Sequence, residues 1–220
     1  MLWAENLLLL LTDQRSGRLV APWNRVDLAL AGSVLGQLSR QGRIGVDHPG
    51  RPRRPGRIRV LDASPTGDDI LDPVVAMLAE TPRRPVVAIH RIKQGLRRSL
   101  YDRLARRGVV GHRTGRTLLV VPVDEWPPHG PAVTAPFAGR LAHWWSSAPF
   151  REATEDDECS SASALLEAIG AIRPVAGRIG LAGRYRTIRQ LAVRERQASW
   201  VATAVYEIYT ANQARTIAQS

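Results

Sequence analysis

The side chains in this sequence that are best suited to binding chemistry are the arginines between residues 83 and 116. Arg97 and Arg98 lie in a stretch of helical periodicity, and Arg113 and Arg116 flank a Thr-Gly pair shortly after it. A guanidinium group donates paired hydrogen bonds to phosphate, so this concentration of arginine is suited to binding anions. The 31 basic and 20 acidic residues give a formal charge of +11. We therefore expect an anionic partner: nucleic acid, an anionic membrane surface or a phosphorylated small molecule.

The arginine bias has a second explanation, because Lys93 is the only lysine in the chain. A GC-rich genome favours arginine codons and would produce the same bias without any binding role. A basic helix face that is merely solvated is a further alternative. The charge therefore restricts the class of partner but does not by itself identify a site.

Other kinds of chemistry find little support in the sequence. The histidines are His48, His90, His112, His129 and His143. They are not paired at metal-ligand spacing, so no metal site is expected. Cys159 stands alone in an acidic polar stretch, which suits a reducing cytosol and disfavours a reactive thiolate. The carboxylates at Asp68, Asp69 and Asp72 are better explained as helix caps than as an acid–base pair. We therefore expect a cytoplasmic protein that is not an enzyme and needs no cofactor.

A scaffold of helices must position the arginines, and its centre is predicted to be the stretch from Val26 to Gly42. Apolar residues there cover almost every direction around a helix, which is typical of a helix buried on all sides. Gly32, Ser33 and Gly36 leave room for neighbouring helices to approach closely. The sequence thus predicts a mainly α, multi-helical single domain over residues 1–220, built around this helix and carrying one or two small β-hairpins.

The arginines themselves are predicted to lie on a long helix and on a hairpin after it. Residues 87–107 repeat an apolar residue every four positions, which places six basic side chains outside: Lys93, Arg97, Arg98, Arg103, Arg106 and Arg107. Residues 112–123 read as a hairpin with 113–116 at its tip and an apolar run at 118–121. A first hairpin is predicted from 43–46 and 58–61.

Three further segments complete the prediction. Residues 124–136 form a proline-rich loop with Trp126, 151–161 is the one acidic segment with Glu152 to Glu158, and 185–195 is a basic helix. The apolar run from Leu7 to Leu11 is too short to cross a bilayer, so any membrane contact is expected to be peripheral.

Two binding functions fit the same features of the helix and hairpin. Arginines beside an apolar hairpin are suited to an anionic membrane surface. A helix followed by a short hairpin is also the order of a winged-helix DNA-binding module, although the segment before Ile92 is interrupted by proline.

Short motifs follow one another along the chain in a characteristic order. They are Glu5-Asn6 before the leucine run, Trp23-Asn24 leading into the glycine-bearing helix that ends Gln41-Gly42-Arg43-Ile44, Pro65-Thr66-Gly67-Asp68 with Leu71-Asp72, and Leu96-Arg97 through Leu104-Ala105-Arg106-Arg107-Gly108-Val109. In this order the chain resembles the Golgi phosphoprotein 3 family, including its shorter bacterial relatives, over most of its length. The Pro-Thr-Gly-Asp element is the most specific piece.

The resemblance implies a helical fold with a protruding hairpin and binding of phosphatidylinositol 4-phosphate at a membrane. In eukaryotic members this recruits the protein to Golgi membranes, where it holds glycosyltransferase tails. The family's lipid-binding tryptophan corresponds to Trp23 and one of its arginines to Arg97. Two other family arginines correspond to Ala31 and Gln94. Either Arg98 or the hairpin arginines are expected to substitute for them, or the headgroup differs. The structural alternative for Trp23 is a hydrophobic plug between helices.

The sequence therefore predicts a peripheral membrane protein that binds anionic phosphoinositide-type headgroups through Trp23, Arg97 and Arg98. The hairpin is expected to contact the membrane through Arg113, Arg116, Leu118 and Leu119. Expected partners are the lipid and cytosolic tails of membrane enzymes, with a homo-oligomer through the hairpin as a further alternative. The competing functions are nucleic-acid binding and an adaptor or scaffold that has lost its lipid site.

Overall fold

The computed structural model describes residues 1–47, 56–117, 121–130, 133–147 and 157–218. Its helices are α1 (Trp3–Leu11), α2 (Trp23–Arg40), α3 (Leu71–Glu80), α4 (Pro85–Ile92), α5 (Leu96–Arg106), α6 (Ala135–Ser146), α7 (Asp157–Ala168), α8 (Ile172–Arg178), α9 (Tyr185–Ala198) and α10 (Trp200–Ile217). The strands are β1 (Ile44–Val46), β2 (Ile58–Val60), β3 (Arg113–Thr117) and β4 (Val121–Glu125), paired as two antiparallel hairpins. The predicted mainly α fold with two small hairpins is confirmed.

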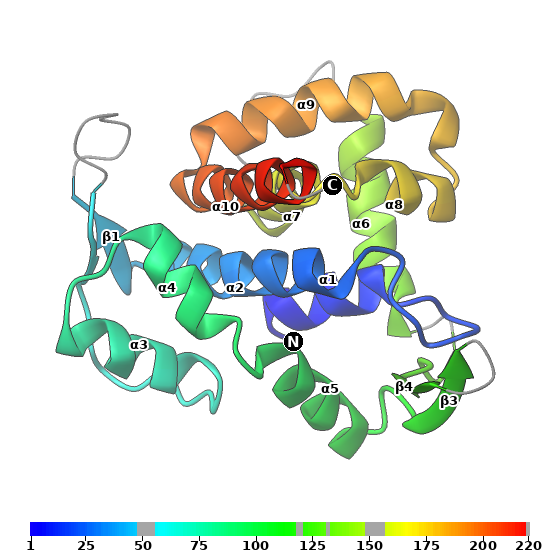
Figure 1. Cartoon of the computed structure of the whole chain (residues 1–220), viewed down its shortest axis with the longest axis horizontal. Coiled ribbons are helices and arrows are strands. Elements are labelled where there is room, and N and C mark those ends of the chain that lie inside the picture. Colours follow the sequence, from blue (N-terminus) through cyan, green and yellow to red (C-terminus); the bar gives the residue numbers. More distant parts are fainter. Residues whose placement is uncertain (48–55, 118–120, 131–132, 148–156, 219–220) are drawn as a thin grey trace.

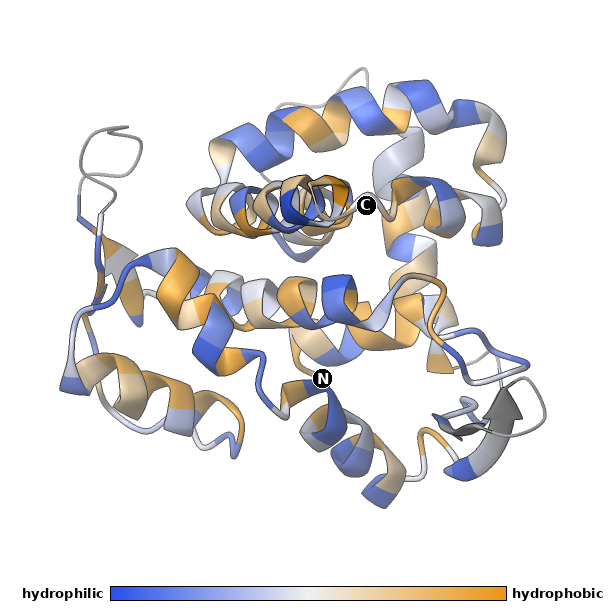
Figure 2. Cartoon of the chain, in the orientation of Figure 1, coloured by the Kyte–Doolittle hydropathy of each residue, from blue (hydrophilic) through white to orange (hydrophobic). Residues whose placement is uncertain are grey.

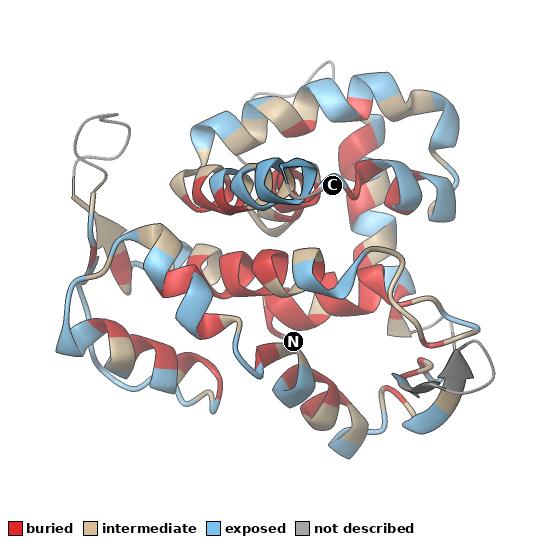
Figure 3. Cartoon of the chain, viewed as in Figure 1, coloured by how far each residue is buried: buried red, intermediate tan, exposed pale blue. Residues whose placement is uncertain are grey.

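Helix α2 is the centre of this fold, as its all-round apolar pattern predicted. It packs against α1, α4, α5, α7 and α10, so a neighbour covers nearly every side of it. Figure 3 shows its middle turns as buried, and Val26, Leu30 and Leu35 have no exposed surface. The elements lie in tiers around it: α7, α9 and α10 on one side, and α3, α5 and the β3–β4 hairpin on the other (Figure 1). Orange segments concentrate where these tiers meet (Figure 2).

Gly32 lets α7 and α10 approach α2 closely. A Cβ atom at Gly32 would lie 2.6 Å from Leu165 Cδ2 and 3.0 Å from Val205 Cγ2. We predict that Gly32→Ala destabilises the protein by about 1–2 kcal/mol, because overpacking a core costs roughly 1–3 kcal/mol. The better helix propensity of alanine, roughly 1 kcal/mol, offsets only part of that cost. Urea unfolding followed by circular dichroism measures the change.

Gly139 on α6 supplies the control for this substitution. It is exposed, and a Cβ atom there would meet nothing within 4 Å. Gly139→Ala should therefore leave stability unchanged or raise it by up to about 1 kcal/mol. Equal stability of Gly32→Ala and the native chain would contradict the close approach of the helices.

The predicted long helix over 87–107 is wrong, because the structure divides it into α4 and α5. Gly95 separates them with a φ of 74°, a left-handed conformation that glycine adopts at little cost. The break places Arg97 and Arg98 in the first turn of α5. It also changes the surroundings of Arg103, which was predicted to lie outside but is only 4% exposed.

The hairpins differ in how well they were predicted. The β1–β2 pairing of Ile44 with Val60 and Val46 with Ile58 confirms the first one. In the second hairpin Arg113 pairs with Glu125 and Thr117 with Val121, so residues 113–116 form a strand and not the predicted tip. Of the proline-rich loop predicted at 124–136, the first two residues belong to β4 and the last two to α6. Within the described ranges, no helix is long and apolar enough to cross a bilayer.

Candidate functional site

Trp23 and Arg97 lie at the same end of α2. Trp23 is the first residue of the helix and is 64% exposed, so it is not the hydrophobic plug considered as an alternative. Asp27 follows four residues later, on the same face of the helix as Trp23. Arg97 reaches this face from α5, and its Nε lies 2.7 Å from Asp27 Oδ1. The structure therefore anchors Arg97 one helical turn from Trp23.

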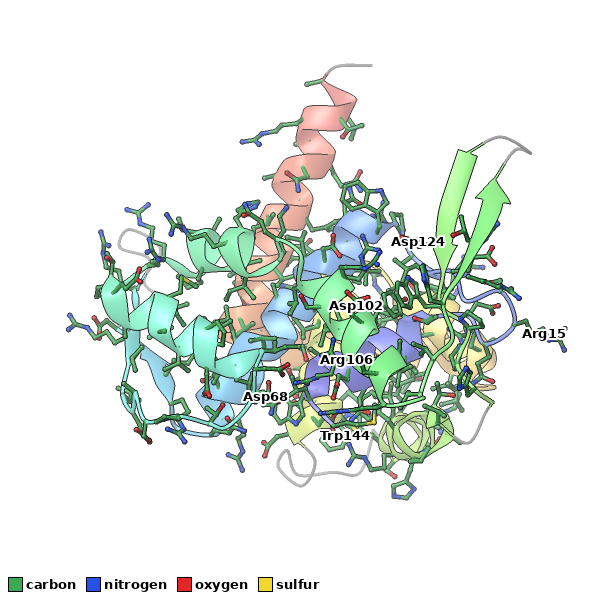
Figure 4. The ribbon with its side chains drawn as sticks, turned by 90° about the horizontal axis from the view of Figure 1, so that it is seen from below. Arg15, Asp68, Asp102, Arg106, Asp124 and Trp144 are labelled. Atoms are coloured by element: carbon green, nitrogen blue, oxygen red, sulfur yellow. The ribbon has the colours of Figure 1, made fainter. Side chains whose placement is uncertain are left out.

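Arg98 connects α5 to the base of the β3–β4 hairpin. Its Nε lies 3.1 Å from both carboxylate oxygens of Asp102, one turn along α5, and its Nη1 lies 3.2 Å from Asp124 Oδ2 on β4. Figure 4 shows Asp102 on α5 and Asp124 at the hairpin beside it. The guanidinium also lies 5.2 Å from the ring centre of Trp126, within cation–π range.

Trp126 is the residue of this region that the sequence did not single out, beyond placing it in a loop. It is buried and lies between two rings: Tyr101 at 4.9 Å between centroids and His112 at 4.2 Å, both nearly parallel to it. The Tyr101 hydroxyl forms a 2.7 Å hydrogen bond with Thr12 Oγ1, and burial raises the pKa of Tyr101 to about 12. This stack fixes the hairpin to α5 and α1. A tryptophan inside a proline-rich segment was the only sequence signal for it.

The hairpin arginines take a different position from the one predicted. Arg113 lies at the base of β3, where its Nε is 2.8 Å from Glu125 Oε2. Arg18 binds the other oxygen of Glu125, also at 2.8 Å, and the two arginines lower the pKa of this carboxyl. Arg113 therefore braces the hairpin against the loop after α1, and nothing places it at a membrane-contacting tip. Arg116 belongs to β3 by its backbone, and Leu118 and Leu119 lie outside the described residues.

The two site arginines are balanced by carboxylates, which was not predicted. Asp27, Asp102 and Asp124 neutralise Arg97 and Arg98, so an incoming anion must share the guanidinium groups with them. A guanidinium has five N–H donors, and Arg97 contacts Asp27 through Nε only. The side chains of Arg97 and Arg98 remain 32% and 58% exposed. Both also lie in the first turn of α5, where the helix dipole adds positive potential.

His112 and Asp124 provide a test of this arrangement. The hydrogen bond between His112 Nε2 and Asp124 Oδ1, 3.0 Å long, is the main reason that the pKa of Asp124 lies below its ordinary value. We predict that His112→Ala raises the pKa of Asp124 towards that value. A carboxyl whose pKa is lowered by folding stabilises the protein above its unfolded pKa and loses this effect as the pH falls through its folded pKa. NMR titration of the Asp124 carboxyl carbon measures the shift, and an unchanged titration would contradict the assignment.

The two positions that correspond to further arginines of the family differ in their burial. Ala31 is completely buried within α2, so no side chain there can face a ligand at the surface. Gln94 is exposed in the turn before α5 and lines a cavity of about 400 Å³ together with Leu96, Ser99 and Asp102. Arg97 and Arg98 are therefore the two arginines of α5 that accompany Trp23 at this site.

The most specific motif of the sequence proves to be structural. Asp72 accepts hydrogen bonds from the amides of Thr66 and Gly67, which closes the turn before α3. Asp68 Oδ1 accepts from the amides of Ile70 and Leu71, so the predicted role as a helix cap is confirmed. Asp68 and Asp69 also bind the buried Arg103, which in addition binds Glu5 on α1. Together these residues hold α1, α3 and α5 in place.

The fold and the site define a mainly helical protein that presents an exposed tryptophan beside paired arginines and braces a β-hairpin against them. The family model described as Golgi phosphoprotein 3 matches residues 3–211, and the chain belongs to this family. No curated protein sequence matches the chain as a relative. Family membership indicates an adaptor or lipid-binding role.

Proposed function

We propose that the protein is a peripheral membrane adaptor that binds phosphoinositide-type headgroups through Trp23, Arg97 and Arg98. Phosphatidylinositol 4-phosphate is the headgroup that the resemblance to the Golgi phosphoprotein 3 family implies. The observation that carries the proposal is Trp23, a 64% exposed indole one helical turn from the Asp27–Arg97 ion pair. An indole exposed to water gains no stabilisation from its apolar surface. At a lipid–water interface both its apolar body and its N–H group are accommodated.

The ion pairs of the site support this role by holding both guanidinium groups in place. Asp27 fixes Arg97 beside α2, and Asp102 and Asp124 fix Arg98 beside the hairpin. A side chain that is already ordered loses less conformational entropy when a ligand binds. The free N–H donors can then bind phosphate oxygens in charge-assisted hydrogen bonds. The formal charge of +11 attracts the protein to anionic membranes over a longer range.

In this proposal the protein works at the cytoplasmic surface of a membrane, without catalysis, and holds the cytosolic tails of membrane enzymes. The cavity beside Gln94 and Leu96 lies next to the site and leaves space for such a segment. The hairpin, braced by Trp126 and Glu125, stands next to Arg98 and would approach the same surface.

A lipid-composition series tests the proposal. Vesicles of phosphatidylcholine alone are compared with vesicles that also contain phosphatidylserine, phosphatidylinositol or phosphatidylinositol 4-phosphate, by co-sedimentation at physiological salt. We expect binding to rise with the phosphorylated lipid beyond the effect of charge alone. Equal binding to neutral and phosphoinositide vesicles would contradict it. Absence of binding to every composition, with recovery of a protein partner, would favour the adaptor that has lost its lipid site.

Nucleic-acid binding remains the second candidate because α4, a short turn, α5 and the β3–β4 hairpin follow in the order of a winged helix. The exposed Trp23 argues against it, because a lipid–water interface accommodates an indole and phosphate contacts along a duplex do not need one. Retention on duplex DNA that falls steeply with salt, without vesicle binding, would favour this candidate.

A further inference from the structure

One group of unpaired positive charges lies on α8 and α9, away from the site described above. The site arginines Arg97 and Arg98 are held by carboxylates. In contrast, four exposed arginines on α8 and α9 form neither an ion pair nor a side-chain hydrogen bond with the residues that the structure describes, as is also true of Arg84, Arg91 and Arg215 elsewhere. The four are Arg173, Arg186, Arg189 and Arg194. No described residue uses their hydrogen-bond donors, which can therefore bind an external anion.

Three of these arginines share one face of α9. Arg186, Arg189 and Arg194 are three and eight positions apart along α9, so they occupy its outward half, while Ile188 and Ala192 are buried on the opposite half. Helix α9 packs on α7 and α10 with that buried half. Figure 1 shows α9 at one edge of the molecule and α5 with the hairpin at the opposite edge, with α2 between them. We call Arg186, Arg189 and Arg194 the α9 face.

The composition of the α9 face favours a lipid surface over a nucleic acid. Proteins that bind single strands stack bases on aromatic side chains, and Tyr185, the aromatic residue of α9, is packed against the core. A helix that reads the major groove must project from its domain, whereas α9 lies lengthwise on α7. Attraction of arginines to anionic lipids needs neither device, since it depends on surface charge and scarcely on shape.

We propose that the α9 face binds a second anionic membrane, so that the protein bridges two bilayers. This inference rests on the proposed function, in which Trp23, Arg97 and Arg98 occupy the first bilayer. Because α9 lies at the opposite edge from α5, a molecule seated on one bilayer through α5 presents the α9 face to another (Figure 1). One copy of the chain is sufficient for bridging.

Vesicle bridging is measured by light scattering and by energy transfer between two dye-labelled vesicle populations. The vesicles contain phosphatidylcholine, phosphatidylserine and phosphatidylinositol 4-phosphate. The test variant is Arg186→Gln/Arg189→Gln/Arg194→Gln. Because each surface arginine contributes appreciably to attraction by an anionic leaflet, we expect this variant to bridge on the order of a hundredfold less efficiently. Its co-sedimentation with single vesicles should remain within about threefold of the native chain.

The matched control is Arg84→Gln/Arg91→Gln/Arg215→Gln, which removes the same charge from exposed arginines just before α4, on α4 and on α10. It should bridge like the native chain. Bridging by the α9 variant at the native level would overturn the inference and indicate an oligomer that carries two copies of the first site. Loss of duplex DNA binding in the α9 variant, without bridging by the native chain, would assign the face to nucleic acid and also overturn it.

The two proposals fail in different ways. If the native chain sediments with phosphoinositide vesicles but never bridges them, the bridging inference alone is wrong. If Arg97→Ala/Arg98→Ala binds vesicles like the native chain while the α9 variant does not bind, the α9 face is the primary membrane surface. That result would refute both the proposed site and the bridging mechanism.

Discussion

Replacing Arg103 with alanine should destabilise the protein by about 3–5 kcal/mol, because it leaves a buried carboxylate without its main partner. Glu5 has no exposed surface, and its Oε1 lies 2.8 Å from Arg103 Nε. The Leu2 amide, 2.7 Å from Oε2, and Arg107, 3.2 Å from Oε1, remain but cannot replace a buried guanidinium. Arg103 also binds Asp68 and Asp69, so the substitution releases the turn before α3 from α5 as well. Urea unfolding measures the change.

Arg106 is the control on the same helix. Its side chain is 66% exposed and reaches only Asp69, at 3.9 Å, so Arg106→Ala should change stability by less than about 0.5 kcal/mol. Adding Glu5→Gln to Arg103→Ala should recover part of the loss, since it removes the uncompensated charge. Similar stabilities of Arg103→Ala and Arg106→Ala would show that the buried network does not hold the three helices together.

Arg97→Ala/Arg98→Ala should weaken binding to phosphatidylinositol 4-phosphate vesicles by at least about tenfold. Charge-assisted hydrogen bonds contribute roughly 1.5–3 kcal/mol each, and competition from the neighbouring carboxylates reduces that figure. Tenfold corresponds to about 1.4 kcal/mol, which is a lower limit for two such bonds. Arg84→Ala/Arg91→Ala, with the same net charge, should bind within about threefold of the native chain. Equal losses in both variants would indicate attraction by the whole surface instead of a site.

The sequence predicted the buried parts of the fold better than the connections. A helix that is apolar on all sides must be buried on all sides, so the apolar pattern of α2 predicted the central helix. The division of residues 87–107 was not predicted, because the apolar spacing continues across the turn in which Gly95, with a left-handed φ of 74°, separates α4 from α5. The tip of the second hairpin was misplaced for a similar reason. The Thr-Gly pair at 114–115 resembles a turn, but these residues pair with Asp124 and Val123 in the middle of the sheet.

The residues of the candidate site come from the sequence, and the structure adds their charge balance. Trp23, Arg97 and Arg98 were identified by their types and by the family resemblance. Their ion-pair partners could not be identified from the sequence, because Asp27 lies 70 residues from Arg97 and Asp124 lies 26 residues from Arg98. For the same reason Arg103 was expected at the surface: its position on the helix gave no sign of the three carboxylates that surround it in the fold.

NMR of the side-chain N–H groups, with a soluble short-chain phosphatidylinositol 4-phosphate as ligand, tests the central claim most directly. The account predicts saturable shifts of the Trp23 indole N–H and of the Nε–H signals of Arg97 and Arg98, with little change at Arg84 or Arg91. Shifts at other arginines, with Trp23, Arg97 and Arg98 unaffected, would contradict it.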